Sequence, residues 1–193
     1  MDKRTLALLA AFGATTIYGL SHTIAKEVMP AYIQGFGFVQ VRLLGAAILF
    51  WLVSLFIPQQ KIDRADFPKI LLCALFGMVI NMLCFFKGIE LSTPINSAVL
   101  ITITPILVFV FSAILIKGRV LLPRVVGVIM GFIGALVLIV FGNEIRQDAP
   151  NIPLGNTLFV VNASSFAMYL VLVKSRSAKY TTVHLLKWLF LFG

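Results

Sequence analysis

Apolar residues follow one another in long blocks along this chain, and short polar connections separate the blocks. A helix needs about 20 mainly apolar residues to span the hydrocarbon core of a bilayer. Six blocks reach or approach that length: residues 6–25, 36–57, 70–86, 95–116, 125–142 and 156–173. A seventh begins near Val183 and has 11 residues when the sequence ends at Gly193. The pattern predicts an all-α, polytopic membrane protein.

The composition excludes the main alternatives to a membrane protein. Hydrophobic residues make up 60% of the chain and charged residues 12%, and the mean hydropathy is +1.03. Soluble domains are typically about 45–50% apolar and about 25% charged, and disordered chains are less hydrophobic still. A net charge of +9 would suggest nucleic acid as a partner, but the basic residues are scattered between apolar blocks rather than gathered in a stripe. We expect the lipid bilayer as the surroundings and no nucleic-acid partner.

The basic residues predict an orientation in the membrane. With the N-terminus in the cytoplasm, eleven Lys and Arg residues fall on the cytoplasmic side and three on the opposite side, while Arg42 and Lys187 fall within spans. Cytoplasmic loops carry such an excess in most membrane proteins. The first apolar block has 20 residues, longer than the roughly 7–15 of a signal peptide. We therefore expect it to be retained as the first span.

A weak internal repeat emerges when the chain is offset by 148 residues, which aligns 6–45 with 154–193. Each copy holds a span, a lysine, a turn with a tyrosine and the start of another span. Because five spans precede the second copy, the two units have opposite topologies, an arrangement common in secondary transporters. The repeat predicts a first unit of five helices and the beginning of a second unit at 154–193. On this interpretation about six and a half of ten spans are present, and the sequence is a fragment of a longer protein. Five aligned pairs are identical: Leu6 and Leu154, Lys26 and Lys174, Tyr32 and Tyr180, Leu43 and Leu191, Gly45 and Gly193.

Polar side chains at membrane depth are the candidates for function, because placing them in lipid is costly. Tyr18 and His22 share a face of the first helix with Lys26, which either reaches a cavity or extends to the interface. Arg42 has no carboxylate near it in sequence; its guanidinium suits a substrate carboxylate or phosphate, but it would equally extend to the interface or hold backbone carbonyls. Hydrogen bonding between helices is the alternative role for Asn81. The predicted cavity residues are Tyr18, His22, Arg42, Asn81, Asn96, Thr102, Asn162 and Tyr169.

Proline and glycine positions predict local geometry. Thr93 and Pro94 suit an N-cap and the first turn of a helix. Pro105 lacks the N–H that would bond the carbonyl of Ile101 and predicts a bend. No acidic residue lies in mid-membrane, so the sequence favours a substrate with a negative group over carboxylate-based proton coupling. Three glycines share one face of the fifth block and predict close helix packing: Gly127, Gly131 and Gly134.

Three stretches carry a family resemblance. Residues 19–27 are Gly-Leu-Ser-His-Thr-Ile-Ala-Lys-Glu, residues 41–47 are Val-Arg-Leu-Leu-Gly-Ala-Ala, and residues 85–98 are Phe-Phe-Lys-Gly-Ile-Glu-Leu-Ser-Thr-Pro-Ile-Asn-Ser-Ala. In them the chain resembles the EamA-type family of the drug/metabolite transporters. The resemblance implies ten helices in two inverted units around a central cavity, the first unit at 6–141 and the second from 154 onward. It also matches Arg42 to a basic residue of the family's second helix. One departure is Gly118-Arg119, where the family often has an acidic residue after the glycine.

We therefore expect a secondary transporter of a bacterial inner membrane, with a cytoplasmic N-terminus, that exports a small polar metabolite such as an amino acid by alternating access. A seven-helix sensor and a non-transporting half that needs a partner for the missing helices remain open, as does a homodimer. An enzyme is not expected, because His22 and His184 lie in different spans outside any metalloprotease or nucleophile motif. No cofactor or metal is expected.

Overall fold

The computed structural model describes residues 2–29, 31–116, 126–127, 129–131, 133–134, 137 and 149–193. Among them, five helical runs are long and apolar enough to cross a membrane. This confirms an all-α, polytopic membrane protein. The five runs are Arg4–Val28, Gly35–Leu55, Arg64–Leu91, Pro94–Leu115 and Ile152–Ser177.

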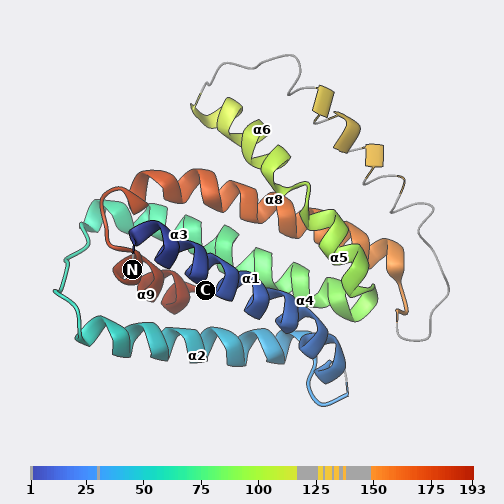
Figure 1. Cartoon of the computed structure of the whole chain (residues 1–193), viewed down its shortest axis with the longest axis horizontal. Coiled ribbons are helices and arrows are strands. Elements are labelled where there is room, and N and C mark those ends of the chain that lie inside the picture. The colour runs from blue at the N-terminus through green and yellow to red at the C-terminus, as the bar shows by residue number, and fades with distance from the viewer. Residues whose placement is uncertain are drawn as a thin grey trace.

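Each of these runs overlaps a predicted span, and a shorter apolar helix, α9 (Thr182–Phe192), covers the start of the seventh. Most of the predicted span at 125–142, and Gly118-Arg119, lie outside the described residues. Figure 1 shows that the beginning of α1 (Lys3–Val28), the end of α2 (Gly35–Leu55) and the turn between α8 (Ile152–Ser177) and α9 share one end of the molecule. This arrangement agrees with spans that cross the membrane in alternating directions, as the predicted topology requires. Which of the two ends faces the cytoplasm, and where the two units begin and end, stay predictions.

Local sequence sets the starts of two helices. Thr93 caps α5 (Pro94–Ile101), and its hydroxyl accepts a hydrogen bond from the N–H of Asn96 at 3.2 Å. Asn151 caps α8 in the same way through the N–H of Leu154 at 3.1 Å. Each cap satisfies an N–H that has no partner inside the helix, and the predicted helix start at Thr93 is confirmed.

The third span is a continuous run that changes its helical type. It comprises η1 (Arg64–Asp66), α3 (Phe67–Ala74), the π-helical turn η2 (Leu75–Ile80) and α4 (Asn81–Leu91). A π turn widens the helix and redirects carbonyls, and the carbonyl of Phe76 here accepts from the hydroxyl of Ser165 at 2.6 Å. The wide turn lies close to α8 because Gly77 has no side chain: an added Cβ would lie 2.6 Å from the ring of Tyr169.

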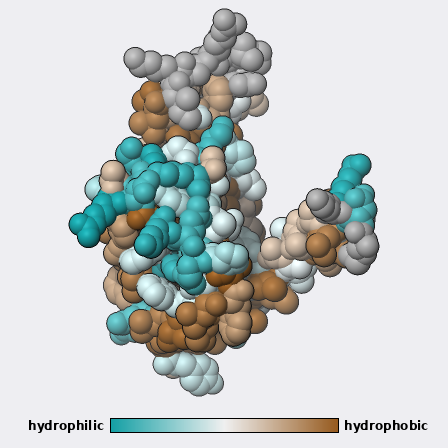
Figure 2. Space-filling view, turned by 90° about the vertical axis from the view of Figure 1, so that its left-hand side faces the viewer, coloured by the Kyte–Doolittle hydropathy of each residue, from teal (hydrophilic) through white to brown (hydrophobic). Residues whose placement is uncertain are grey.

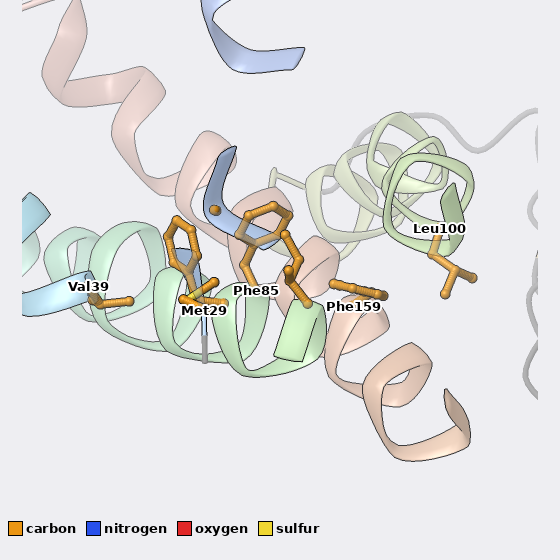
Figure 3. Close-up of a cluster of buried hydrophobic side chains, with 8 residues drawn as sticks. Met29, Val39, Phe85, Leu100 and Phe159 are labelled. Atoms are coloured by element: carbon orange, nitrogen blue, oxygen red, sulfur yellow. The ribbon is translucent and has the colours of Figure 1, made fainter. Parts of the chain in front are cut away.

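Helix α8 packs between α4 and α6 (Thr104–Ile116), and α9 packs against α2. Phe85 on α4 and Phe159 on α8 meet at the centre of one buried cluster, with ring centroids 6.1 Å apart (Figure 3). That cluster contains Ala25, Met29, Val39, Phe85, Phe86, Ile89, Leu100 and Phe159. A second cluster lies toward the end where α8 meets α9 and contains Ile70, Cys73, Ala74, Met78, Val173, Leu185 and Leu189. Apolar burial at both ends therefore holds α8 in place.

Candidate functional site

A cavity of about 320 Å³ lies among α1, α2, α4, the junction of α5 and α6, and α8. Its volume falls in the range of about 300–1,000 Å³ that is typical of small-molecule sites. Four residues predicted from sequence line it: Tyr18, Arg42, Asn81 and Asn162. Seven other described residues also line it: Ser21, Met82, Phe85, Phe86, Ile101, Thr104 and Phe166. The cavity thus combines one cation, two amides and an aromatic wall.

Arg42 is the charged residue of the lining. It lies two turns into α2, and its guanidinium carbon is 5.5 Å from the ring centroid of Phe86 on α4. A cation over an aromatic face is attracted by the ring, which positions the guanidinium at the cavity wall. Within the described part of the chain, Arg42 forms no ion pair with a carboxylate. The site therefore has a positive potential that attracts an anionic group.

Asn81 and Asn162 join α4 to α8 across the cavity wall. The side-chain amide of Asn162 donates to the backbone carbonyl of Asn81 at 2.8 Å, and that of Asn81 donates to the carbonyl of Asn162 at 3.3 Å. Both residues therefore bond α4 to α8 and also line the cavity, while their contact with a substrate stays a prediction.

A break in the fourth span contributes the opposite wall. Helix α5 ends at Ile101 and α6 begins at Thr104, with tight bonds from the N–H of Thr102 to Val99 and from the N–H of Ile103 to Leu100. The break immediately precedes Pro105, as expected from its missing N–H. The hydroxyl of Thr104 is buried and has no hydrogen-bond partner among the described residues.

Three predicted residues lie away from this cavity lining. The amide of Asn96 donates to the side-chain oxygen of Asn156 at 3.1 Å, and the hydroxyl of Thr102 bonds the carbonyl of Val99 at 2.6 Å. Tyr169 packs over Gly77, with its ring 5.7 Å from that of Phe166. His22 lies on α1, but its side chain is outside the described part of the structure.

The predicted packing glycines differ from one another. A Cβ added to Gly131 would lie 2.6 Å from the side chain of Ile106 on α6. Gly127 and Gly134 have no described heavy atom within 4 Å of such a Cβ. Close packing is therefore visible at one of the three positions, and at the other two it stays a prediction.

Lys26 bonds the end of α4 instead of lining the cavity. Its ammonium donates to the carbonyls of Ile89 and Ser92 at 2.8 and 2.9 Å. A cation at a helix C-terminus is stabilised by the helix dipole and by carbonyls that lack partners. Nearby, Glu90 accepts from the N–H of Gly35 and pairs with Lys87 at 2.6 Å, so the basic residues at this end have structural contacts.

The aromatic wall was missed from sequence, although the spacing contained a signal for it. Phe85 follows Asn81 by four residues, and Phe166 follows Asn162 by four residues. Residues four apart share a helix face, so each predicted amide indicated the aromatic residue one turn away. The arrangement suits a small molecule that has an anionic group and an apolar part.

No group of His, Cys, Asp and Glu residues in the described ranges could hold a metal ion.

Comparison with known proteins gives one family. The model of the EamA-like transporter family matches residues 5–140. The uncharacterized transporter YetK of Bacillus subtilis is 21% identical over 197 residues, which cover 100% of this chain and 59% of that protein. An uncharacterized transporter of Archaeoglobus fulgidus is 27% identical over 171 residues, which cover 88% of this chain and 58% of that protein. The chain therefore spans less than two thirds of the length of these relatives. No solved structure matches it.

Proposed function

The chain belongs to the EamA-like transporter family, and we propose that it is part of a secondary carrier that binds a small polar metabolite in the cavity around Arg42. The proposed substrate class is a metabolite with a carboxylate, such as an amino acid. The proposed direction is export across a bacterial inner membrane, with the N-terminus in the cytoplasm. The carrier would contain the unit at 6–141 and a second unit that begins at 154.

The observation that carries this proposal is a guanidinium at a cavity wall that has no ion-paired carboxylate among the described residues. An unpaired charge at membrane depth is costly, and a substrate carboxylate would offset that cost with two parallel hydrogen bonds. Asn81 and Asn162 offer polar contacts, while Phe85 and Phe166 suit an apolar side chain. The lining therefore fits one end of the substrate to Arg42 and the rest to the aromatic wall.

The position of the cavity supports alternating access. Its walls come from α1, α2, α4 and the α5–α6 break of the proposed first unit, and from α8 of the proposed second unit. A movement of one unit against the other would therefore open the cavity first to one side and then to the other, as in other inverted-repeat carriers.

Transport by the full-length protein in proteoliposomes tests the proposal, with a panel of radiolabelled amino acids as probes. Arg42→Gln should lower the flux of the transported amino acid at least about tenfold, the effect of losing a charge-assisted contact. Arg42→Lys should keep part of that flux, because the charge remains and the planar fork is lost.

Arg4→Gln is the matched control, because Arg4 is exposed in the first turn of α1 and far from the cavity lining. It should transport at the wild-type rate. Wild-type flux through normally expressed Arg42→Gln would overturn the assignment of Arg42. A panel in which no amino acid is transported would contradict the substrate class.

A further inference from the structure

Two segments far apart in sequence are fastened together at the end where α8 turns into α9. One is the connection from α2 to η1, and the other is the turn around residues 176–184. Figure 2 looks onto this end, where hydrophilic residues gather above a hydrophobic rim. We name the fastening the clasp, and its residues are Gln60, Asp63, Asp66, Arg176, Lys179, Tyr180, Thr181 and His184.

Asp66 is the centre of the clasp. It is 4% exposed and pairs with Arg176, while its second carboxylate oxygen accepts from Lys179 at 2.8 Å and from the hydroxyl of Tyr180 at 2.7 Å. Charge-assisted hydrogen bonds of this kind are stronger than neutral ones, and the more so when they are shielded from water. Lys179 also pairs with Asp63 at the exposed rim, where ion pairs contribute little.

Gln60 fastens the backbone of the turn. Its side-chain oxygen accepts from the N–H of Thr181 at 2.8 Å, and its amide donates to the carbonyl of Lys179 at 3.0 Å. Its own N–H donates to Nε2 of His184 at 3.2 Å, and Nδ1 of His184 lies 2.8 Å from the hydroxyl of Thr181. Because backbone groups of both segments take part in these hydrogen bonds, the clasp fixes the position of one segment relative to the other.

The clasp lies beyond an apolar layer that separates it from the cavity. Along the Arg64–Leu91 run, Asp66 comes first, then Ile70 and Met78 of the second buried cluster, and then Asn81 of the cavity lining. Along α8 the order is reversed, from Asn162 through Val173 to Arg176. The layer and the clasp thus close the same path between the two helices.

We propose that the clasp is a gate, which closes the cavity at this end of the helices and separates in each transport cycle. The inference rests on the proposed carrier function, because the clasp joins the proposed first unit to the proposed second one. The ionic and hydrogen-bonded groups of the clasp suit this role, since water can replace their partners when the segments part. The apolar layer behind the clasp must separate in the same movement, and its exposure adds to the free energy that opening costs.

Accessibility of a cavity cysteine tests the gate without any substrate. The background is the full-length protein in membrane vesicles, with Cys73 and Cys84 replaced by alanine. Ser21→Cys places the reporter in the cavity lining, and a parallel Lys61→Cys protein marks the clasp side, because Lys61 is exposed in the connection after α2. The probe is a membrane-impermeant maleimide, added to vesicles of each orientation.

Asp66→Asn should increase labelling of the reporter about tenfold from the clasp side and decrease it from the opposite side, because the equilibrium moves toward the state open at the clasp. Tyr180→Phe, which leaves the charges in place, should shift both rates in the same directions but less. Tyr180→Phe also tests the gate if Asp66→Asn fails to fold. Tyr32→Phe is the matched control, since Tyr32 is 87% exposed, and it should change neither rate.

A merely structural tie would give different results. Both rates would then stay unchanged in folded Tyr180→Phe and Asp66→Asn, or both would rise together, and either outcome would overturn the gate. Cross-linking gives a second readout: a disulfide between Gln60→Cys and Thr181→Cys should stop flux reversibly, and undiminished flux through the cross-linked protein would also overturn it. Because labelling needs no substrate, a failure of the amino-acid panel would leave the gate result standing.

Discussion

Helix α8 is held in different ways at its two ends. At its beginning, Gly155 and Asn156 meet Gly88 of the third span and Ser92, the residue that follows that span, in a contact of small and neutral groups. We name these four residues the glycine junction. At its other end, the clasp uses charges and long side chains. The first contact depends on shape and tolerates no extra atoms, whereas the second depends on partners that water can replace. If the clasp separates as proposed, we therefore expect the glycine junction to stay packed, while apolar burial contributes to the packing at both ends.

The largest effect is expected from a bulky residue at the glycine junction. A Cβ on Gly155 would lie 2.9 Å from the carbonyl oxygen of Gly88 and 2.5 Å from Cβ of Ser92. Because two backbones meet there, Gly155→Leu should lower the free energy of unfolding by more than about 3 kcal/mol, measured by thermal unfolding in detergent micelles. Gly45→Leu is the control, since nothing described lies within 4 Å of a Cβ at Gly45. Equal losses in the two variants would show that the close contact at Gly155 does not stabilise the fold.

The next effect concerns the hydrogen bonds of the same junction. Asn156 is fully buried and accepts from the hydroxyl of Ser92 at 2.7 Å and from the amide of Asn96 at 3.1 Å. Asn156→Ala leaves both donors without this acceptor and should cost about 1–3 kcal/mol in the same unfolding assay. Thr157→Ala, at the exposed neighbouring position, should cost less than about 0.5 kcal/mol. A stable Asn156→Ala protein would show that shape alone holds the junction.

A smaller effect is expected at the clasp. Tyr180 is buried and bonds Asp66 through its hydroxyl, so Tyr180→Phe should lower the free energy of unfolding by about 1 kcal/mol. Tyr32 occupies the matching position at an offset of 148 residues but is exposed, and Tyr32→Phe should leave stability unchanged. A larger loss in Tyr180→Phe than in Asn156→Ala would reverse the proposed roles of the two ends.

The sequence predicted where the helices lie better than it predicted which helices pack against one another. Block length located the spans, and Pro105 located the break in the fourth. The face shared along the first span drew attention to Tyr18, and depth in the second span drew attention to Arg42; both line the cavity. The sequence could not separate Asn81, which lines the cavity, from Asn96, because periodicity does not say which helices adjoin a face. Binding of a substrate by these residues stays a prediction. The clasp was missed because its charges were counted only as loop residues. Its signal was the matched spacing of Asp63 and Asp66 with Arg176 and Lys179, three residues apart in each case.

Salt concentration should affect the clasp but not the glycine junction at the other end of α8. The expected change in the labelling rate is small. At the exposed rim of the clasp, the side chains of Lys179 and Asp63 are 46% and 65% exposed, so salt screens their attraction. Raising the salt from about 0.05 to 0.5 M should therefore increase the rate at which the cavity cysteine is labelled from the clasp side by less than about threefold. Asp63→Asn should remove most of this salt response, whereas Asn156→Ala should keep it.

The ratio of this labelling rate to the rate of the same reporter cysteine in the Asp66→Asn protein, taken at equal pH, should not change between pH 7 and 9, because the ionisation of the reporter thiol affects both rates alike. The pKa of Lys179 is raised above its ordinary value, first by the hydrogen bond to Asp63 and then by that to Asp66. The contribution of Lys179 to the clasp is therefore complete below its ordinary pKa and is lost only as the pH rises through the higher pKa of the folded protein. A ratio that depends on pH in this window but not on salt would mean that another group, and not the Lys179 pair, limits the opening of the clasp.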